Sequence, residues 1–398
     1  MEQKTDSRAS EALRFDRMEL AGSLGDLGTL LPIVVGMILL NHLQVSSVFL
    51  WFGLFYIVAG LYYRLPIPVQ PLKAVGAIAI AYPDKITAET IGAAGIVFGL
   101  ILLFLSLSGL MGRVAKLFTP AVVRGIQLGL GLIFLRKGIE LIAAPELFLQ
   151  AGAPNLPYAN LALGLVAFLL VLLLLDNKKF PAGIAVLALG VAAGLAFGGS
   201  GRLNFAFGPS EIKVLVPSLD AFKTALVLLI LPQIPLTIGN ACVGTADTCC
   251  SLFPEHPALT RATAARFAFT MGIVNLPAGF MGAVPMCHGT GGLAAHYRFG
   301  ARTGGASIII GLVLILLALA LGEFGFSVLG LIPKSVLGVL LVFAGLELCP
   351  LVRNLKTNEE FFVALLVAGI ALAVPNMAWA FGAGMVADFI VKRFRVKI

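Results

Sequence analysis

Long apolar runs, separated by short polar loops, make up most of the chain between residues 20 and 391. Several have the roughly 20 residues that a helix needs to cross a bilayer. The pattern predicts an all-α polytopic membrane protein with about 14 transmembrane segments. The apolar runs are 20–41, 46–63, 68–82, 90–110, 119–135, 160–175, 181–198, 221–246, 262–282, 286–297, 305–321, 332–348, 361–375 and 377–391.

Two of these runs, 68–82 and 286–297, are too short to cross a bilayer. Each opens at a proline, Pro68 or Pro285, after a stretch that the prolines keep extended. Short apolar segments of this kind are typical of buried or re-entrant pieces. We therefore expect two half-helices that begin inside the membrane.

Three local matches indicate an internal repeat with a spacing of 213 to 217 residues. Seven segments per repeat is an odd number, so the second copy is expected to insert upside down. The half-helices are then segments 3 and 10, and their N-terminal ends meet near the middle of the bilayer. Because helix N-termini present unpaired N–H groups and partial positive charge, this arrangement favours an anion. The matches pair Gly25 with Gly239, Asp26 with Asn240, Pro68 with Pro285 and Pro120 with Pro333.

The composition agrees with a membrane protein and narrows its class. Only 12% of residues are charged and 59% are hydrophobic, which excludes a soluble enzyme, a secreted disulfide scaffold and a disordered chain. The 45 Gly and 21 Pro residues continue through the apolar runs, which favours a transporter over a simple anchor. The net charge of +8 does not indicate nucleic acid, because no Lys/Arg cluster stands outside the membrane-flanking loops. We expect the five Cys to be reduced thiols.

The positive-inside rule orients the segments. With the N-terminus inside, 19 of the 28 Lys and Arg residues lie in predicted cytoplasmic loops and flanks. This bias predicts both termini in the cytoplasm. The polar N-terminal stretch is not a cleavable signal peptide; it is either a short amphipathic surface helix or a solvated tail. The expected divisions are a cytoplasmic tail (1–18), the first repeat (19–198), an extracytoplasmic connector (199–220), the second repeat (221–391) and a short cytoplasmic tail (392–398).

Gln70 and Lys73 stand at the start of the first half-helix. Lys73 is costly inside a membrane unless it faces a wet cavity or an anion; the alternative is that its ammonium reaches the membrane interface. Gln70 offers two N–H donors to a substrate, or it caps neighbouring backbone.

The stretch Cys287-His288-Gly289-Thr290-Gly291 opens the second half-helix. Glycines let backbone N–H groups approach a ligand closely, and Thr290 adds a hydroxyl donor. His288 donates to an oxyanion, titrates during transport or is a satisfied structural histidine. Neither a metal site nor a Cys–His nucleophile is supported, because no second ligand pair or orienting partner has suitable spacing.

Asp26 is an acid within the first span, which makes it a candidate functional residue. It holds a coupling proton or Na⁺, orients Lys73, or forms a structural ion pair with Lys73 or Arg124. Thr29, Thr237 and Asn240 line a cavity or make helix-packing hydrogen bonds.

At these motifs the sequence resembles the molybdate transporter family, a branch of the sulphate permease (SulP) superfamily. The resemblance implies two intertwined inverted repeats, a core domain that moves against a gate domain, and an oxyanion held between segments 3 and 10 with support from segments 1 and 8. Many members of the superfamily end in a regulatory STAS domain, which we do not expect here. The motifs are GDLGTLLP (Gly25–Pro32), PIPVQPLKA (Pro66–Ala74), LPQIPLTIGNA (Leu231–Ala241) and GAVPMCHGTGGLAAHYRFGARTGG (Gly282–Gly305). The implied substrate-binding residues are Asp26, Thr29, Gln70, Lys73, Asn240, Cys287, His288, Gly289, Thr290 and Gly291.

The expected function is secondary transport of molybdate by alternating access, in the plasma (inner) membrane, without catalysis, cofactor or bound metal. Sulphate or another tetrahedral oxyanion is the alternative substrate, and an anion channel or a non-transporting anion sensor is the alternative class. The coupling ion, a proton or Na⁺, is left open between Asp26, His288 and Asn240. A homodimer is also left open.

Overall fold

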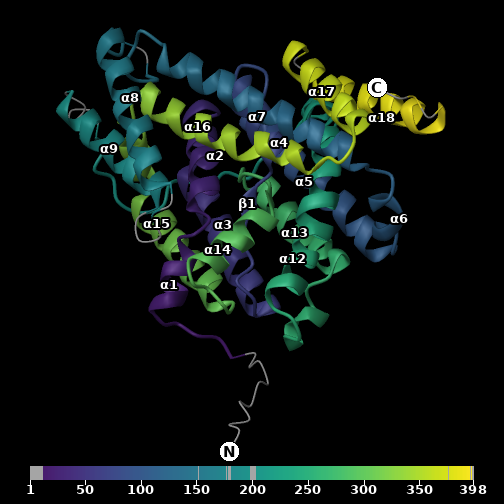
Figure 1. Cartoon of the computed structure of the whole chain (residues 1–398). Helices are drawn as coiled ribbons and strands as arrows, with labels where there is room; N and C mark the ends of the chain where they lie inside the picture. Colours follow the sequence, from purple (N-terminus) through teal and green to yellow (C-terminus); the bar gives the residue numbers. More distant parts are fainter. Residues whose placement is uncertain are drawn as a thin grey trace, which may run out of the picture.

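The computed structural model describes residues 12–150, 152–175, 177, 181–197, 203–374, 376–394 and 396. Helices dominate it, and a single two-stranded sheet lies among them in the part of the chain described (Figure 1). The elements of the first half are α1 (Arg17–Ser23), α2 (Leu27–Leu40), α3 (Val45–Tyr63), β1 (Gln70–Pro71), α4 (Lys73–Ala81), α5 (Ala88–Leu107), α6 (Met111–Ala115), α7 (Pro120–Ile142), α8 (Pro157–Leu174) and α9 (Ala182–Ala196).

The second half repeats this order with one longer, irregular helix at its start. Its elements are α10 (Leu219–Thr224), η2 (Ala225–Ile230), α11 (Leu231–Leu236), η3 (Thr237–Gly244), α12 (Thr245–Leu252), η4 (Pro257–Thr260), α13 (Ala264–Phe280), β2 (Met286–Cys287), α14 (Thr290–Arg298), α15 (Gly305–Leu329), α16 (Lys334–Leu348), η5 (Cys349–Asn354), α17 (Asn358–Ala373) and α18 (Met377–Phe394). η2 and η3 are π-helical, whereas η4 and η5 are 3₁₀-helices.

Within the described residues, six helices are long and apolar enough to cross a membrane, and a seventh span results if the bent pair α1 and α2 is counted as one. The two helices meet at an angle of 43°. Asp26 lies in the break between them, directly before α2. The bend therefore places an acidic side chain and the first turn of α2 in the interior of the protein.

The helix contacts show the inverted repeat. α3 packs against α15, and their counterparts in the other half, α13 and α5, pack against each other in the same way. The contacts of α8 with α16 correspond likewise to those of α17 with α7. Each half thus completes the packing of the other, which confirms a fold of two intertwined inverted repeats.

Glycines permit these close crossings. A Cβ at Gly53 on α3 would lie 2.6 Å from the carbonyl oxygen of Gly311 on α15, and the reverse distance is 2.7 Å. Between the corresponding helices, Gly272 on α13 and Gly99 on α5 make the equivalent reciprocal contact. Small residues of this kind let membrane helices approach closely, since lipid supplies no hydrophobic drive for their association. The high glycine content thus has a structural reason.

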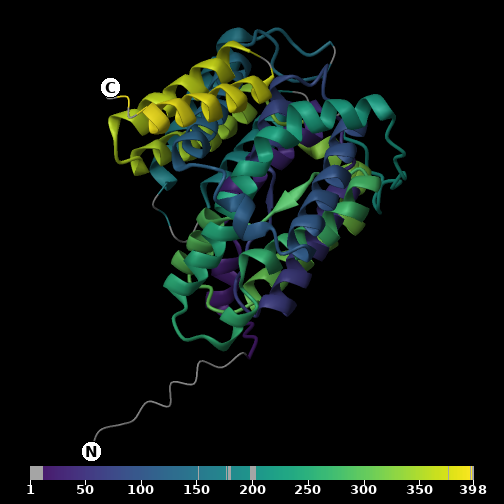
Figure 2. The ribbon, with the colours of Figure 1, turned by 90° about the vertical axis from the view of Figure 1, so that its right-hand side faces the viewer.

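The helices form two groups. The core group contains α1–α5 and α10–α15, and the gate group contains α7–α9 and α16–α18. Figure 2 shows α17 and α18 to one side of the molecule, away from the strand pair, which the core group surrounds. α7 and α16 cross each other in the gate group and also contact α4 and α2 of the core group.

The strand pair lies in the interior of the core group. β1 and β2 are antiparallel, with Gln70 opposite Cys287 and Pro71 opposite Met286. The half-helices therefore begin at Lys73 and Thr290, several residues later than the prolines at which we expected them to open. The reason is local: prolines lack an N–H and hold their preceding residues in extended backbone.

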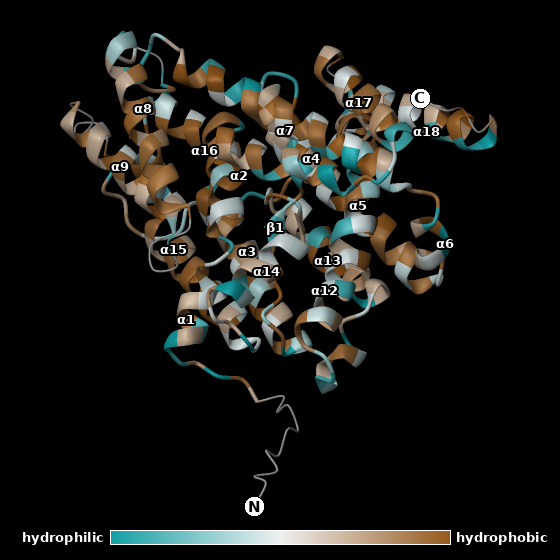
Figure 3. Ribbon diagram, in the orientation of Figure 1, coloured by the Kyte–Doolittle hydropathy of each residue, from teal (hydrophilic) through white to brown (hydrophobic). Residues whose placement is uncertain are grey.

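The outward face suits a lipid environment. Figure 3 shows hydrophobic colours over α8, α9 and α15 at the periphery of the molecule. On α8, Leu161, Leu165 and Leu173 are exposed, the last by 80%. Large exposed apolar surfaces are unusual for soluble monomers and typical of membrane proteins.

Candidate functional site

A cavity of about 600 Å³ lies between the core and gate groups. Both half-helix N-termini reach it, and so do the break before α2, η3, the start of α7 and the end of α16. The lining residues are Gly25, Gly28, Thr29, Gln70, Lys73, Phe118, Pro120, Val123, Arg124, Gly239, Asn240, Gly244, Thr290, Gly291, Ala295, Glu347, Leu348, Leu351 and Asn354.

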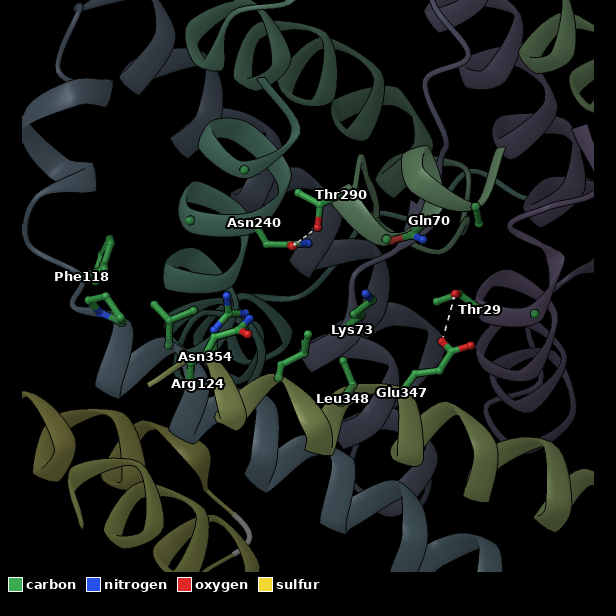
Figure 4. A pocket seen from close by; sticks show the side chains of 18 of the residues that line it. Thr29, Gln70, Lys73, Phe118, Arg124, Asn240, Thr290, Glu347, Leu348 and Asn354 are labelled. Carbon is green, nitrogen blue, oxygen red and sulfur yellow. Dashed lines mark hydrogen bonds between the residues drawn. The ribbon is translucent and has the colours of Figure 1, made fainter. Parts of the chain in front are cut away.

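Lys73 is the first residue of α4 and lies between the two walls of this cavity. Figure 4 shows its ammonium directed into the cavity, with Gln70, Asn240 and Thr290 on one side and Glu347 on the other. No hydrogen bond joins Lys73 to the other side chains drawn there. Of the two alternatives for Lys73, a wet cavity or the membrane interface, this geometry favours the cavity.

Thr290 begins α14, and its hydroxyl donates a hydrogen bond of 2.8 Å to Oδ1 of Asn240. Asn240 belongs to the π-helical stretch η3, where the wider turn changes which side chains face the half-helix. Gly291 follows Thr290, and a Cβ placed on it would meet no atom within 4 Å. The first turn of α14 is therefore open to the cavity.

Gln70 is held by Asp26. Its Nε2 donates a hydrogen bond of 2.6 Å to Oδ1 of Asp26, and both side chains are almost completely buried. Asp26 does not line the cavity itself; it lies behind Gln70. Among the described residues it makes no ion pair with Lys73 or Arg124, the two partners that we considered. Its contact indicates a positioning role for the carboxylate.

Two glycines of the second half fit closely around this pair. A Cβ at Gly289 would lie 2.3 Å from Oε1 of Gln70, and one at Gly292 would lie 2.6 Å from Oδ2 of Asp26. Oδ2 of Asp26 and Oε1 of Gln70 have no hydrogen-bond partner in the described part of the chain. Gly289 therefore belongs to the site through the space that it leaves for Gln70.

His288 points away from the cavity into an aromatic cluster formed by Phe55, Tyr63 and Phe267. It is fully buried, and its Nδ1 lies 2.8 Å from the carbonyl oxygen of Pro68. His296 makes the equivalent contact of 3.0 Å with Pro66. Because an extended proline-rich segment has few backbone partners, these imidazoles satisfy carbonyl groups that would otherwise be buried unpaired. The geometry favours the structural alternative for His288.

Cys287 is also buried, at 5% exposure, and borders a small second cavity that it shares with Lys73 and Asn240. Thr237 lines the same small cavity and accepts a hydrogen bond of 3.0 Å from Gln233. The structure therefore brings Thr29, Gln70, Lys73, Asn240, Thr290 and Gly291 to the large cavity. It places Asp26, Cys287, His288 and Gly289 around it.

Glu347 also lines the cavity, although it lies outside the motifs from which the site was predicted. It lies near the end of α16, and its Oε2 accepts a hydrogen bond of 3.1 Å from the hydroxyl of Thr29. Glu347 is the only acid in the run 332–348, so an isolated charge in a predicted span was the available signal. Arg124, on α7, also lines the cavity and donates a 2.8 Å hydrogen bond to Gln127.

The fold and site together define a class. Two inverted halves, a pair of half-helices meeting N-terminus to N-terminus and a cavity between two helix groups are the arrangement of a secondary transporter. The sequence profile described as "Molybdate transporter of MFS superfamily" matches residues 18–134 and 225–348. The chain belongs to this molybdate transporter family.

Curated proteins of similar sequence support the same family assignment. Molybdate transporter 1 of Arabidopsis thaliana is 33% identical over 401 residues, covering 92% of this chain and 86% of the relative. Molybdate transporter 2 of the same plant is 30% identical, with 94% and 87% covered. Molybdate transporter 1 of Chlamydomonas reinhardtii is 29% identical, with 96% and 93% covered. All three are transporters, so the prediction of a transporter and not an enzyme is confirmed.

Solved structures agree on the fold. The transmembrane domain of the cyanobacterial bicarbonate transporter BicA superposes with a TM-score of 0.66 at 17% identity, covering 91% of this chain and 96% of that one. The murine anion transporter SLC26A9, in its inward-facing state, gives a TM-score of 0.68 at 17% identity, with 96% and 69% covered. At these identities the likeness concerns the fold alone. The SulP-like fold is thereby confirmed, whereas the domain boundaries and site residues remain predictions.

Proposed function

We propose that this protein carries molybdate across the membrane by alternating access, with the oxyanion bound between the N-termini of α4 and α14. The observation that supports this most directly is the convergence of Lys73, Gln70 and Thr290 on one cavity, in which both half-helices begin. An ammonium, an amide, a hydroxyl and two helix N-termini are all donors or positive groups.

A tetrahedral dianion matches this donor set. Its four oxygens point in different directions and accept hydrogen bonds from opposing walls, while Lys73 and Arg124 supply two positive charges. Sulphate has the same shape and charge, so the donors alone separate the two anions weakly. The naming of the Arabidopsis and Chlamydomonas relatives favours molybdate.

Alternating access follows from the placement of the cavity between two helix groups. Its lining includes Phe118 just before α7, Pro120 at the start of α7 and Asn354 at the end of η5, and the last two are exposed. The neighbouring Arg113 and Arg353 are among the basic residues that the positive-inside rule assigns to the cytoplasm. With this orientation we infer an inward-facing carrier, in which movement of the core group past the gate group exposes the half-helices to the other side.

Uptake of labelled molybdate into proteoliposomes tests this function. We expect saturable uptake by the wild-type protein, and a loss of more than tenfold in apparent affinity for Lys73→Ala, since a charge-assisted contact contributes about 1.5–3 kcal/mol. Thr290→Val is expected to weaken binding less, because it removes one neutral hydroxyl that must exchange its hydrogen bond to Asn240 for one to the anion. Lys85→Ala, a lysine in the turn after α4 and outside this cavity, is the matched control and is expected to keep wild-type uptake.

Two results would contradict the proposal. Saturable uptake that is insensitive to both Lys73→Ala and Thr290→Val would exclude this cavity as the binding site. Ion currents far above the turnover of a carrier would indicate a channel. Competition between molybdate and sulphate in the same vesicles measures which anion the site prefers.

A further inference from the structure

Glu347 is the one carboxylate among the lining residues of the cavity, within the described part of the chain. It projects from gate helix α16 toward the half-helices of the core group, as Figure 4 shows. It also borders a third cavity, of about 400 Å³, lined mainly by apolar residues of α8, α9 and α16. The Glu347 side chain is exposed where these cavities lie, and an acid at such a position in a membrane protein is a candidate functional residue.

The charged and titratable groups that face Glu347 come from three other elements. Lys73 on α4 attracts it and Asp26, before α2, repels it. Arg124 on α7 lines the same cavity, and Thr29 on α2 donates the hydrogen bond already described. The residues of α8 and α9 that line the 400 Å³ apolar cavity beside Glu347 are uncharged. Lys73 is thus the cation that faces the Glu347 carboxylate across the boundary between the two groups.

Charge balance then distinguishes the empty from the loaded carrier. In the empty carrier, ionised Glu347 offsets part of the positive charge of Lys73 and Arg124. When a dianion enters, the same cavity holds three negative charges against two positive ones. Like charges that share one cavity repel each other, and a carboxylate beside added negative charge takes up a proton more readily. The Thr29 hydroxyl suits both states, because it donates to a carboxylate and accepts from a carboxyl group.

We propose that Glu347 is the coupling residue of this carrier: it is ionised and serves as the internal counter-ion of Lys73 when the site is empty, and it carries one proton when the oxyanion is bound. This inference rests on the proposed oxyanion transport. One proton from the side of anion entry binds a carboxylate oxygen of Glu347, and the same proton leaves with the anion on the other side. Each cycle then moves one dianion, one proton and a net charge of minus one.

The Glu347→Gln variant separates the movement of the loaded carrier from the return of the empty carrier. A neutral amide mimics the protonated side chain, so the loaded carrier is expected to cross between its two states and to exchange internal for external molybdate at near wild-type rates. The empty carrier lacks its counter-ion and is expected to return slowly, which removes net uptake. Wild-type vesicles at zero membrane potential are expected to accumulate molybdate about tenfold more per pH unit of inward proton gradient. Glu347→Gln is expected to lose that dependence.

The control is Glu211→Gln, the same substitution at an acid whose side chain is 80% exposed in the loop before α10. It is expected to behave as the wild type. A second measurement needs no variant: a molybdate gradient across wild-type vesicles is expected to acidify the lumen, as read by a trapped pH-sensitive dye.

The outcomes distinguish the two proposals. Absence of any molybdate exchange by the wild type contradicts the transport function itself. Exchange without luminal acidification, or proton-driven accumulation that persists in Glu347→Gln, overturns the coupling role while the transport function stands. Loss of net uptake with exchange retained, in Glu347→Gln alone, supports the role of Glu347.

Discussion

At the scale of single residues, the site depends as much on missing side chains as on present ones. Gln70 is clamped between the Asp26 carboxylate and the backbone of Gly289, so its amide has one orientation available. A pre-positioned donor loses less side-chain entropy when a ligand binds. The rigidity of Gln70 thus favours binding without a direct contact from Asp26 or Gly289.

Gly289→Ala tests this positioning. The new methyl group would lie 2.3 Å from Oε1 of Gln70, which displaces the amide and lengthens its hydrogen bond to Asp26. We expect molybdate affinity to fall about tenfold, the equivalent of one hydrogen bond of about 1.4 kcal/mol. Isothermal titration calorimetry on purified protein measures the Kd.

Gly369→Ala is the control for this substitution. Gly369 lies on α17, where an added Cβ meets no atom within 4 Å, so the variant is expected to bind as the wild type does. An unchanged Kd in Gly289→Ala would mean that the orientation of Gln70 does not contribute to binding.

The sequence identified the residues whose chemistry is unusual for a membrane. Lys73 and Asp26 stand out because few charges lie inside the apolar runs. Their different environments, a cavity for one and a buried hydrogen bond for the other, depend on packing between distant segments. The role of His288 shows the same limit, because its partner Pro68 is 220 residues away. Glu347 lies one residue from the end of an apolar run, where a solvated loop is the simpler interpretation.

At the scale of elements, the proline-rich segments made the half-helices predictable. The helices begin several residues later than predicted, at Lys73 and Thr290. The sequence does not reveal that the segments preceding the half-helices pair as strands, since that pairing joins Gln70 to Cys287 across the whole repeat. The π-helical turns of η2 and η3 were not predictable either. They interrupt a continuous apolar pattern without changing it. η3 packs against α13 and α14, whereas η2 packs against α5 and α4.

Substitutions at equivalent glycines test the repeat at this scale. Gly53→Ala forces α3 from α15, and Gly272→Ala forces α13 from α5, because each methyl group would lie under 3.0 Å from a neighbouring atom. Overpacking of this kind costs about 1–3 kcal/mol. We expect both variants to lower the unfolding temperature by a similar amount in a thermal-stability assay in detergent. Gly369→Ala, with open space around it, should leave the temperature unchanged or raise it slightly. A large loss in only one of the two crossings would show that their packing is not equivalent.

At the scale of the whole molecule, the pseudosymmetric fold explains why the N-termini of both half-helices meet between the halves. Inversion brings two like helix ends together, and both ends carry partial positive charge. The sequence alone indicates this much, since the inverted order follows from an odd number of segments. It does not indicate which conformational state is most stable, because that depends on the many contacts between the core and gate groups.

Orientation in the membrane is the property of the whole molecule that sequence and structure jointly predict. The connector before α10 is expected outside, and the loop between η5 and α17 inside, together with Asn354, which lines the cavity at the end of η5. In a Cys250→Ser background, which removes the exposed native thiol, Lys213→Cys is expected to react with a membrane-impermeant maleimide on intact cells. Lys356→Cys is expected to react only after permeabilisation. Both positions are exposed, so accessibility from one side and not burial decides the result. The opposite labelling pattern would place the cavity mouth outside, and the structure would then represent the state that faces the incoming anion.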